Sequence, residues 1–98
     1  MRFSVRTTDY QRNRMLNICD EDLVGRKLKD GEIKVSIDRG CYGGRIVGAD
    51  EARELLQNAS IINMAGEETI SLSLGLGIGA ENGVKKIDGV PFLIVFKM

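Results

Sequence analysis

The chain has 98 residues, with 14 basic and 14 acidic side chains and no histidine. This length predicts one domain, residues 1–98, because two independent cores would each fall near the lower size limit for folding alone. The balanced charge argues against a surface built as a whole to hold nucleic acid or an anionic membrane, and leaves a local patch open. No apolar stretch is typical of a signal peptide or a membrane span, so we expect a cytoplasmic protein with no membrane role.

The first third of the chain predicts a hairpin and a short helix. Residues 2–6 alternate, with Phe3 and Val5 on one face, which is typical of a half-buried strand. Residues 15–19 form a second apolar run, and the polar residues 7–13 would be the loop between the two strands. Residues 20–31 are predicted to form a helix with Asp20 at its N-cap and Gly31 after its end. Gly25 in its middle disfavours this helix by about 1 kcal/mol.

The middle of the chain predicts two strands, a turn and one clear helix. Residues 32–37 alternate as a strand does, residues 40–44 are glycine-rich and predict a turn, and residues 45–47 predict a short strand. Residues 50–59 place apolar side chains at i, i+3, i+4 and i+7, which indicates an amphipathic helix. Residues 60–64 predict the next strand.

The last third contains one ambiguous segment and one hairpin. Residues 70–78 alternate as a strand does, whereas the acids that follow Gly66 favour a helix start. Asp88 and Gly89 predict a two-residue turn between strands at 84–87 and 90–97. Residues 92–96 are all apolar, so we expect a central strand covered on both faces. Together these elements predict a small α+β domain, a mostly antiparallel sheet with two or three helices packed on it.

The residue inventory disfavours an enzyme. Without histidine the chain cannot form a Ser–His or Cys–His device, and it lacks the commonest proton shuttle near neutral pH. Cys19 and Cys41 stand apart and do not form a zinc motif, so we expect neither a metal nor a cofactor. A disulfide between them stays open, although reduced thiols are usual in the cytoplasm. Cys19 precedes a predicted helix start that would activate its thiol, but a small buried side chain is the favoured interpretation.

Two segments could make contacts with a partner. The amino-terminal hairpin carries arginines opposed by a single acid, together with Tyr10, and arginine beside an exposed aromatic ring is typical of RNA contact. The alternative is a solvated strand face whose charges protect an edge. The segment 40–44 combines Tyr42 with Gly43 and Gly44, which fits either a tight turn or a nest of backbone amides that binds a ligand.

Four short motifs, read together and in order, resemble the archaeal family known as domain of unknown function 424. These motifs are Cys19-Asp20-Glu21, Tyr42-Gly43-Gly44, Asn63-x-x-Gly66-Glu67 and Gly89-Val90-Pro91. The resemblance covers nearly all of residues 2–91 and implies an archaeal cytoplasmic protein with no established activity, loosely associated with translation. It also implies a helix from Gly66 to about Leu76, which we adopt against the alternation. Members of the family tend to continue Gly-Val-Pro with a His and a nearby Gln, where this chain has Phe92 and Ile94.

Our leading hypothesis is a non-enzymatic binding module for an RNA or a protein of the translation machinery. The candidate RNA contacts are Arg6, Tyr10, Arg12 and Arg14. Further candidate binding residues are Tyr42, Gly43, Gly44, Asp20 and Asn63. The alternative hypothesis is a small-molecule-binding protein or minor enzyme that uses the region of Asp20, Tyr42 and Gly43.

Overall fold

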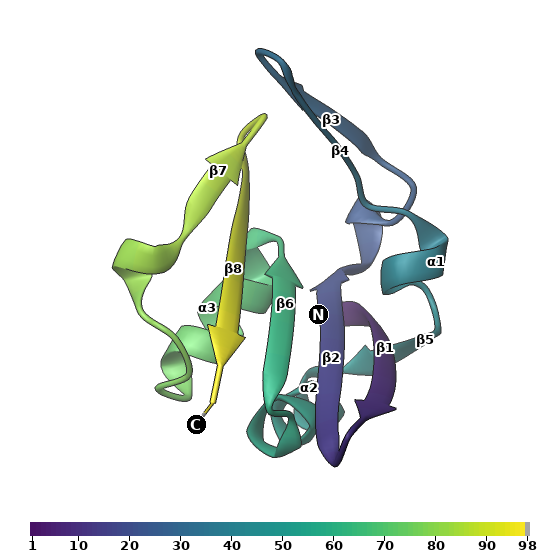
Figure 1. Cartoon of the computed structure of the whole chain (residues 1–98), viewed down its shortest axis with the longest axis vertical. Coiled ribbons are helices and arrows are strands. Elements are labelled where there is room, and N and C mark those ends of the chain that lie inside the picture. The colour runs from purple at the N-terminus through teal and green to yellow at the C-terminus, as the bar shows by residue number, and fades with distance from the viewer. Residues whose placement is uncertain (98) are drawn as a thin grey trace.

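The computed structural model describes residues 1–97, which form a six-stranded sheet, a separate two-stranded hairpin and three α-helices (Figure 1). The strands are β1 (Arg2–Tyr10), β2 (Asn13–Asp20), β3 (Lys27–Asp30), β4 (Ile33–Ser36), β5 (Arg45–Gly48), β6 (Ile61–Ala65), β7 (Lys85–Ile87) and β8 (Val90–Phe96). The helices are α1 (Arg39–Tyr42), α2 (Ala49–Asn58) and α3 (Glu67–Gly75), and 3-10 turns occur at Glu21–Leu23 and Glu81–Gly83.

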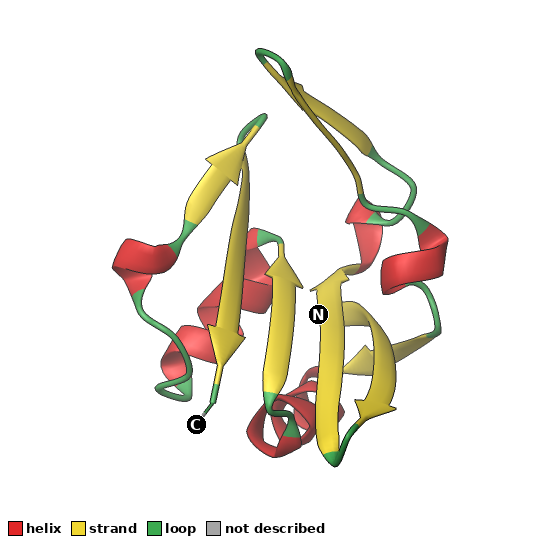
Figure 2. Ribbon diagram, in the orientation of Figure 1, coloured by secondary structure: helices red, strands yellow, loops and turns green. Residues whose placement is uncertain are grey.

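The six strands lie in the order β5-β1-β2-β6-β8-β7, and each neighbouring pair is antiparallel except β2 and β6 (Figure 2). The α+β class and the mostly antiparallel sheet predicted from the sequence are therefore confirmed. No helix within residues 1–97 has both the length and the apolar character needed to cross a lipid bilayer.

Helices α2 and α3 cover one face of the sheet and enclose the main core. Phe3 and Val5 of β1 are buried on this face as predicted, while Ser4 between them is buried on the opposite face beneath α1 and Arg6 is exposed. Burial of one aliphatic side chain stabilises the fold by roughly 1.5–3 kcal/mol. The core residues are Phe3, Val5, Leu16, Ile18, Val47, Ala52, Leu56, Ala59, Ile62, Met64, Ile70 and Leu93.

The opposite face is covered at one end only, where the parallel strands β2 and β6 stop. There a second core cluster forms beneath α1 and the β3–β4 hairpin, and it contains Cys19, Leu23, Leu28, Ile37, Ala65 and Val90. Tyr42 of α1 and Val35 of β4 are partly buried against it. The rest of this face carries no helix.

Two hairpins touch at their tips. The backbone amide of Lys29 in β3 donates to Asp88 Oδ2 at 3.2 Å, and the backbone amide of Asp88 donates to Asp30 Oδ2 at 3.2 Å. These reciprocal bonds join the β3–β4 hairpin to the β7–β8 hairpin, and Figure 1 shows the two tips converging. We call this contact the tip clasp.

Most of the elements predicted from periodicity are present. The helix predicted at 50–59 is α2, and the strands predicted at 32–37, 45–47 and 60–64 are β4, β5 and β6. The predicted Asp88-Gly89 turn joins β7 to β8 with φ of +53° and +78°. The pattern of two positive φ values is the one that the tightest hairpin turns require.

The loop predicted at residues 7–13 is wrong. Strands β1 and β2 stay paired as far as Tyr10 and Asn13, so only Gln11 and Arg12 form the turn, with φ of 49° and 71°. Ladder hydrogen bonds need no apolar side chains, and Thr7 and Thr8 are β-branched residues that suit an exposed strand. The paired strands of the hairpin therefore extend beyond the apolar residues from which the strands were predicted.

The helix predicted over residues 20–31 is also wrong. After one 3-10 turn the chain continues as β3, with Gly25 at φ +92° before it and Gly31 at φ +62° in the turn that follows. Leu28 is buried in the second cluster while its neighbours are exposed, which is a strand pattern. The turn predicted at 40–44 is replaced by α1 and the residues after it, because Asp38 Oδ1 accepts from the Cys41 amide at 2.9 Å and caps a short helix.

Residues 67–75 form α3, as the resemblance implied and the alternation did not. Thr69, Ile70 and Ser73 are its buried residues, and they share one side of a helix although their spacing is not that of a strand. The Ser73 hydroxyl donates to the Ile78 carbonyl at 2.8 Å, which closes the helix end. A buried hydroxyl with this bond is tolerated because its polar atom is satisfied.

The expectation that residues 92–96 are covered on both faces is wrong. In β8 the side chain of Leu93 is buried, whereas Ile94 is 59% exposed and Phe96 is 66% exposed. At Ile94 and Phe96 only the face toward α3 is covered, whereas Phe92 of the same strand is partly buried against the second core cluster.

Candidate functional site

The predicted RNA contacts of the β1–β2 hairpin lie on different surfaces. Cross-strand partners share a face, so Arg6 with Asn17 and Tyr10 with Asn13 lie on the side opposite α2 and α3. Arg14 pairs with Asp9 on the helix side, where its Nε lies 3.1 Å from Asp9 Oδ1. Arg12 stands at the turn itself. The structure therefore places Arg6 and Tyr10 on one face of β1, four residues apart, and Arg14 on the other face.

The predicted Tyr42-Gly43-Gly44 contact segment is held tightly against β1. The Ser4 hydroxyl donates to the Tyr42 carbonyl at 2.7 Å, and Arg6 donates to the Gly43 carbonyl through Nε at 3.0 Å and Nη2 at 2.6 Å. A Cβ at Gly43 would lie 2.5 Å from Arg39 Cγ, and one at Gly44 would lie 2.6 Å from the Val5 carbonyl oxygen. Close packing against Arg39 of α1 explains Gly43, and close approach to Val5 of β1 explains Gly44, without a ligand.

The side chain of Tyr42 has two environments. Its ring is partly buried against the second core cluster, and it also lines a cavity. Burial raises the pKa of its hydroxyl from 10.0 to about 12, and the group is uncharged near neutral pH at either value. The ring is available as an uncharged wall of the cavity.

Asp20 caps α3, a helix far along the chain, rather than the segment that follows it. Its carboxylate accepts from the Thr69 amide at 2.8 Å, from the Thr69 hydroxyl at 2.7 Å and from the Glu68 amide at 3.2 Å. These are amides that a helix leaves unpaired at its start. Because Asp20 already occupies them, the start of α3 offers those donors to no external anion.

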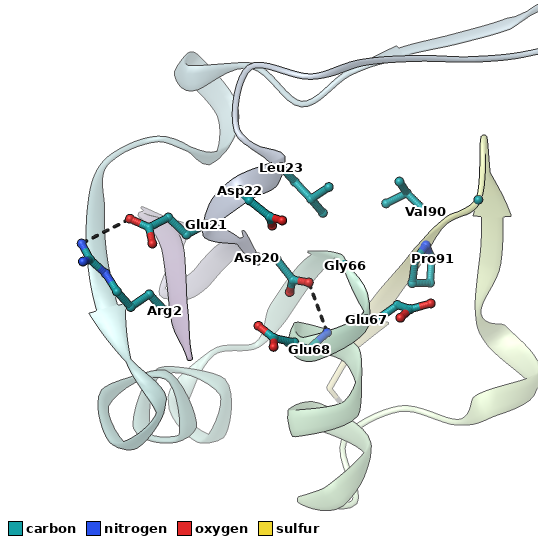
Figure 3. Close-up of a pocket in the computed structure, with 11 residues that line it drawn as sticks. Arg2, Asp20, Glu21, Asp22, Leu23, Gly66, Glu67, Glu68, Val90 and Pro91 are labelled. Atoms are coloured by element: carbon teal, nitrogen blue, oxygen red, sulfur yellow. Dashed lines mark hydrogen bonds and ion pairs between the residues drawn. The ribbon is translucent and has the colours of Figure 1, made fainter.

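An acidic cleft of about 460 Å³ surrounds this cap (Figure 3). Its carboxylates are those of Asp20, Glu21, Asp22, Glu67 and Glu68, and Arg2 pairs with Glu21 at 3.2 Å. Three of the four motifs behind the resemblance meet here, because Gly66-Glu67 and Gly89-Val90-Pro91 line the same cleft. The Gly66 amide donates to the Pro91 carbonyl at 2.9 Å, so these motifs join three parts of the fold. Within residues 1–97 no group of His, Cys, Asp and Glu side chains is placed to hold a metal ion.

Asn63 belongs to a chain of amides on the side of the sheet opposite α2 and α3. Its Nδ2 donates to Asn17 Oδ1 at 2.8 Å, and Asn17 Nδ2 donates to the Cys41 carbonyl at 3.0 Å. A backbone carbonyl can only accept, so it fixes which end of each amide donates. Asn63 Oδ1, at the end of this chain of amides, accepts no hydrogen bond from the protein among residues 1–97.

The strand residues that point away from α2 and α3, up to and including those at the edge of α1, form what we call the open face. Its members are Arg6, Thr8 and Tyr10 of β1, Asn13, Met15 and Asn17 of β2, Ile61 and Asn63 of β6, and Ile94 and Phe96 of β8. Tyr10, Ile94 and Phe96 are 62%, 59% and 66% exposed. None of these members is acidic. Sequence reasoning found Arg6, Tyr10 and Asn63 but missed Phe96, because an all-apolar strand was expected to be buried.

A cavity of about 440 Å³ adjoins the open face at the end beneath α1 and the β3–β4 hairpin. Its lining includes Val35 of β4, Tyr42 of α1, Asn63 of β6, Phe92 of β8 and Lys85 of β7. No carboxylate lines it. Asp20 lies in the acidic cleft instead, so the residues proposed together for a small-molecule site belong to different hollows.

The two cysteines are free thiols. Cys19 is buried, and desolvation together with the charges of Asp20 and Asp22 raises the pKa of its thiol to about 12. Cys41 is exposed, and its hydrogen bond to Asp38 raises its pKa. Neither environment activates a thiolate near neutral pH.

Comparison with known proteins places the chain in a family. A search of curated proteins finds no match. A crystal structure described as that of an uncharacterized conserved protein from Methanopyrus kandleri is similar, with a TM-score of 0.79 and 25% sequence identity over 100% of this chain and 95% of that one. The family model "Protein of unknown function (DUF424)" matches residues 8–98. The chain belongs to this family, domain of unknown function 424, as its motifs indicated.

Proposed function

We propose that the protein is a non-enzymatic RNA-binding module that lays a single strand across the open face. The observation that carries the proposal is the composition of that face: it carries two exposed aromatic rings, Tyr10 and Phe96, and a hydrogen-bonded pair of asparagine amides, Asn17 and Asn63. Single-stranded RNA is recognised by stacking of bases on aromatic rings and by hydrogen bonds to their edges. The face supplies both kinds of group on adjacent strands.

Stacking of bases on the two rings would give affinity for RNA without selecting a base sequence. Each base stacked on an aromatic side chain contributes roughly 1–3 kcal/mol, and every base has a suitable face. Tyr10 and Phe96 lie on β1 and β8, with β2 and β6 between them. Met15 and Ile61, half-buried on those inner strands, provide apolar surface along the path.

The distribution of charge supports the same path. Arg6 on the open face and Lys85 beside it are exposed bases, while the acids of the cleft lie where β2 and β6 stop. RNA phosphates are attracted by the two bases and repelled by the carboxylates of the cleft. A strand of RNA would therefore avoid the acidic cleft, which agrees with the internal capping of α3 by Asp20.

Fluorescence anisotropy with labelled 12-nucleotide RNAs tests the proposal. Phe96→Ala and Tyr10→Ala should each weaken binding by about 5- to 150-fold, the loss of one stack. Ile33→Ala is the matched control, because Ile33 is 56% exposed but lies at the β3–β4 tip. Saturable binding that is indifferent to Phe96 and Tyr10, or no saturable binding at low salt, would overturn the proposal.

Two further measurements separate RNA from other occupants of the face. Arg6→Gln should lower the slope of log affinity against log salt by about 0.7, whereas Arg53→Gln on α2 should leave it unchanged. If Phe96→Ala alters only the oligomeric state in light scattering, the face is a contact between copies. Association with the translation machinery stays a prediction, checked by co-sedimentation of the wild type and Phe96→Ala with ribosomal particles.

A further inference from the structure

We propose that a hollow where α1 meets β1 and β5 is a binding site for one phosphate group, held by Arg6 and Arg39. The inference rests on the proposed function for the source of the phosphate, which is the backbone of the RNA strand on the open face. The hollow has a volume of about 540 Å³, within the range of small-ligand pockets, roughly 300–1,000 Å³. We call it the arginine hollow, and its lining includes Ser4, Arg6, Arg39, Gly43 and Ile46.

Two arginines without a carboxylate partner line this hollow together. The chain has eight arginines, and those that form ion pairs within residues 1–97 are Arg2 with Glu21, Arg14 with Asp9, Arg45 with Glu51 and Arg53 with Asp50. Arg6 and Arg39 are exposed and belong to the remaining arginines. Because no carboxylate of these residues neutralises them, both are left to bind an external anion.

Arg6 is oriented by a group that does not cancel its charge. Its Nε and Nη2 donate to the Gly43 carbonyl oxygen at 3.0 Å and 2.6 Å. A guanidinium group has five N–H donors, so this bond leaves both hydrogens of Nη1 and one of Nη2. The edge formed by Nη1 and Nη2 is a fork that fits two oxygens of a phosphate. Because the carbonyl holds this edge in place beforehand, less entropy is lost when an anion binds.

Arg39 approaches the same glycine. A Cβ at Gly43 would lie 2.5 Å from Arg39 Cγ, so the stem of Arg39 packs directly on this residue. Gly43 therefore binds one arginine through its carbonyl and gives space to the stem of the other. Both side chains contact one residue and line one hollow, which places them to share a single phosphate.

The other charged residues around the hollow already have partners. Arg45 and Glu21 also line it, but Arg45 pairs with Glu51 and Glu21 pairs with Arg2, the second pair being visible in Figure 3. Asp38 precedes Arg39 but is not part of the lining, and its carboxylate caps α1. The lining charges without a partner among residues 1–97 are therefore both positive, and they favour an anion.

Arg6 connects the arginine hollow to the open face, because it belongs to both. Tyr10 lies four residues further along β1 on the same face, and four residues of a strand span about 13 Å. A strand of RNA that stacks one base on Tyr10 and continues along β1 therefore brings its backbone to the hollow. This continuity favours a backbone phosphate as the ligand.

Inorganic phosphate tests the hollow without RNA. In ¹H–¹⁵N NMR spectra it should shift the Nε–H signals of Arg6 and Arg39 saturably, whereas sodium chloride at equal ionic strength should not. Arg39→Gln should weaken this binding about tenfold, the loss of one charge-assisted contact. Arg26→Gln is the matched control and should change nothing, because Arg26 is also exposed and outside the ion pairs but does not line the hollow. Glu21→Gln should tighten phosphate binding, since it removes the carboxylate from the lining.

Fluorescence anisotropy with the 12-nucleotide RNAs tests whether the phosphate belongs to the strand. Arg39→Gln should lower the slope of log affinity against log salt by about 0.7, the value for one single-strand phosphate contact. Arg6→Gln combined with Arg39→Gln should also lower it by about 0.7, because both side chains bind the same phosphate. A loss of about 1.4 in the double variant would show two separate contacts and overturn the shared site.

The outcomes distinguish this inference from the proposed function. If inorganic phosphate leaves the Arg6 and Arg39 signals unchanged, or binds Arg39→Gln as tightly as the wild type, the phosphate site is wrong, whatever Phe96→Ala does to RNA binding. If phosphate binds the hollow but no RNA binds the open face, the ligand is a free phosphate and the RNA proposal fails. If RNA binds with a salt slope indifferent to Arg39→Gln, the strand does not use the hollow and the inference fails alone. Thermal melts check that each variant is folded.

Discussion

Asp20 bonds Thr69 twice, through the backbone amide at 2.8 Å and the side-chain hydroxyl at 2.7 Å, although the two residues lie on different elements of the fold. The pair ties the end of β2 to the start of α3. A helix cap that a distant strand supplies is a tertiary contact as much as a local one. Its loss should therefore destabilise both the end of β2 and the start of α3.

Asp20→Ala should lower the free energy of unfolding by about 2 kcal/mol, because the variant loses charge-assisted bonds and leaves the Thr69 hydroxyl buried without a partner. Urea denaturation followed by circular dichroism measures the change. Asp22→Ala is the control, since Asp22 is exposed and should stay within about 0.5 kcal/mol of the wild type. Equal losses of unfolding free energy in the two variants would contradict the role of Asp20 as the cap of α3.

Gly66→Ala should destabilise the protein by about 2–4 kcal/mol, since Gly66 has φ +110° and an added Cβ would lie 2.4 Å from Asp20 Cγ. In an Asp20→Ala background the contact is gone and only the backbone strain remains, about 1–2 kcal/mol. A double-mutant cycle should therefore give a coupling above about 0.5 kcal/mol. Strict additivity of the two changes would argue against the close approach.

The Gln11-Arg12 turn should be improvable. Both residues have positive φ, and neither is of the type that tolerates it best. Gln11→Asn with Arg12→Gly installs the preferred residues and should raise the free energy of unfolding by about 1–2 kcal/mol. Arg12→Lys, which leaves the backbone preference unchanged, is the control in thermal denaturation. A lower melting temperature in the double variant would contradict the turn geometry.

The protein should lose stability in alkali. Burial raises the pKa of the Cys19 thiol from 9.0 to about 12 and that of the Tyr42 hydroxyl from 10.0 to about 12. A folded pKa above the unfolded value means that the stabilisation is complete below pH 9 and is lost as the pH rises toward 12. Urea midpoints at pH 8, 9, 10 and 11 should fall over the last three values. Cys19→Ser should flatten part of this slope, and a flat profile in the wild type would contradict both assignments.

The thiols should differ in accessibility. Cys41 is exposed and Cys19 is buried, so a thiol reagent at pH 8 should modify one cysteine in the native protein and both in urea. Asp38→Asn should speed the native reaction, because the hydrogen bond that raises the pKa of Cys41 is weakened. Native labelling of two thiols, retained in Cys41→Ser as one, would show that the second core cluster is open to solvent.

Periodicity found those elements whose stability is local in origin. The amphipathic pattern of α2 and the positions of Phe3 and Val5 in β1 indicate directly which side of each element packs against the main core. It failed for α3, because residues 70–78 alternate as a strand does and the Asp20 cap that holds the start of the helix comes from a distant strand. It failed at residues 20–31 as well, where Gly25 at positive φ ends the first turn and lets Leu28 point inward from a strand.

The candidate site was predictable only in its polar part. Arg6 and Tyr10 were found by composition, and Asn63 by resemblance. Phe96 was missed because an apolar run has the same appearance whether one face or both are covered, and coverage depends on where α1 and the β3–β4 hairpin pack. Asn17 gave no local signal either, since its role depends on the Cys41 carbonyl and the Asn63 amide, which come from other elements.

The tip clasp makes the lengths of two hairpins interdependent. Lys29 and Asp30 meet Asp88 only because the β3–β4 and β7–β8 hairpins reach the same point in space. Each added residue extends a strand by about 3.3 Å, so a paired insertion in one hairpin alone would carry its tip past the other and break both bonds. Relatives that keep the clasp should therefore change the two hairpins together, by matching insertions or deletions on either side of Gly31 and Gly89.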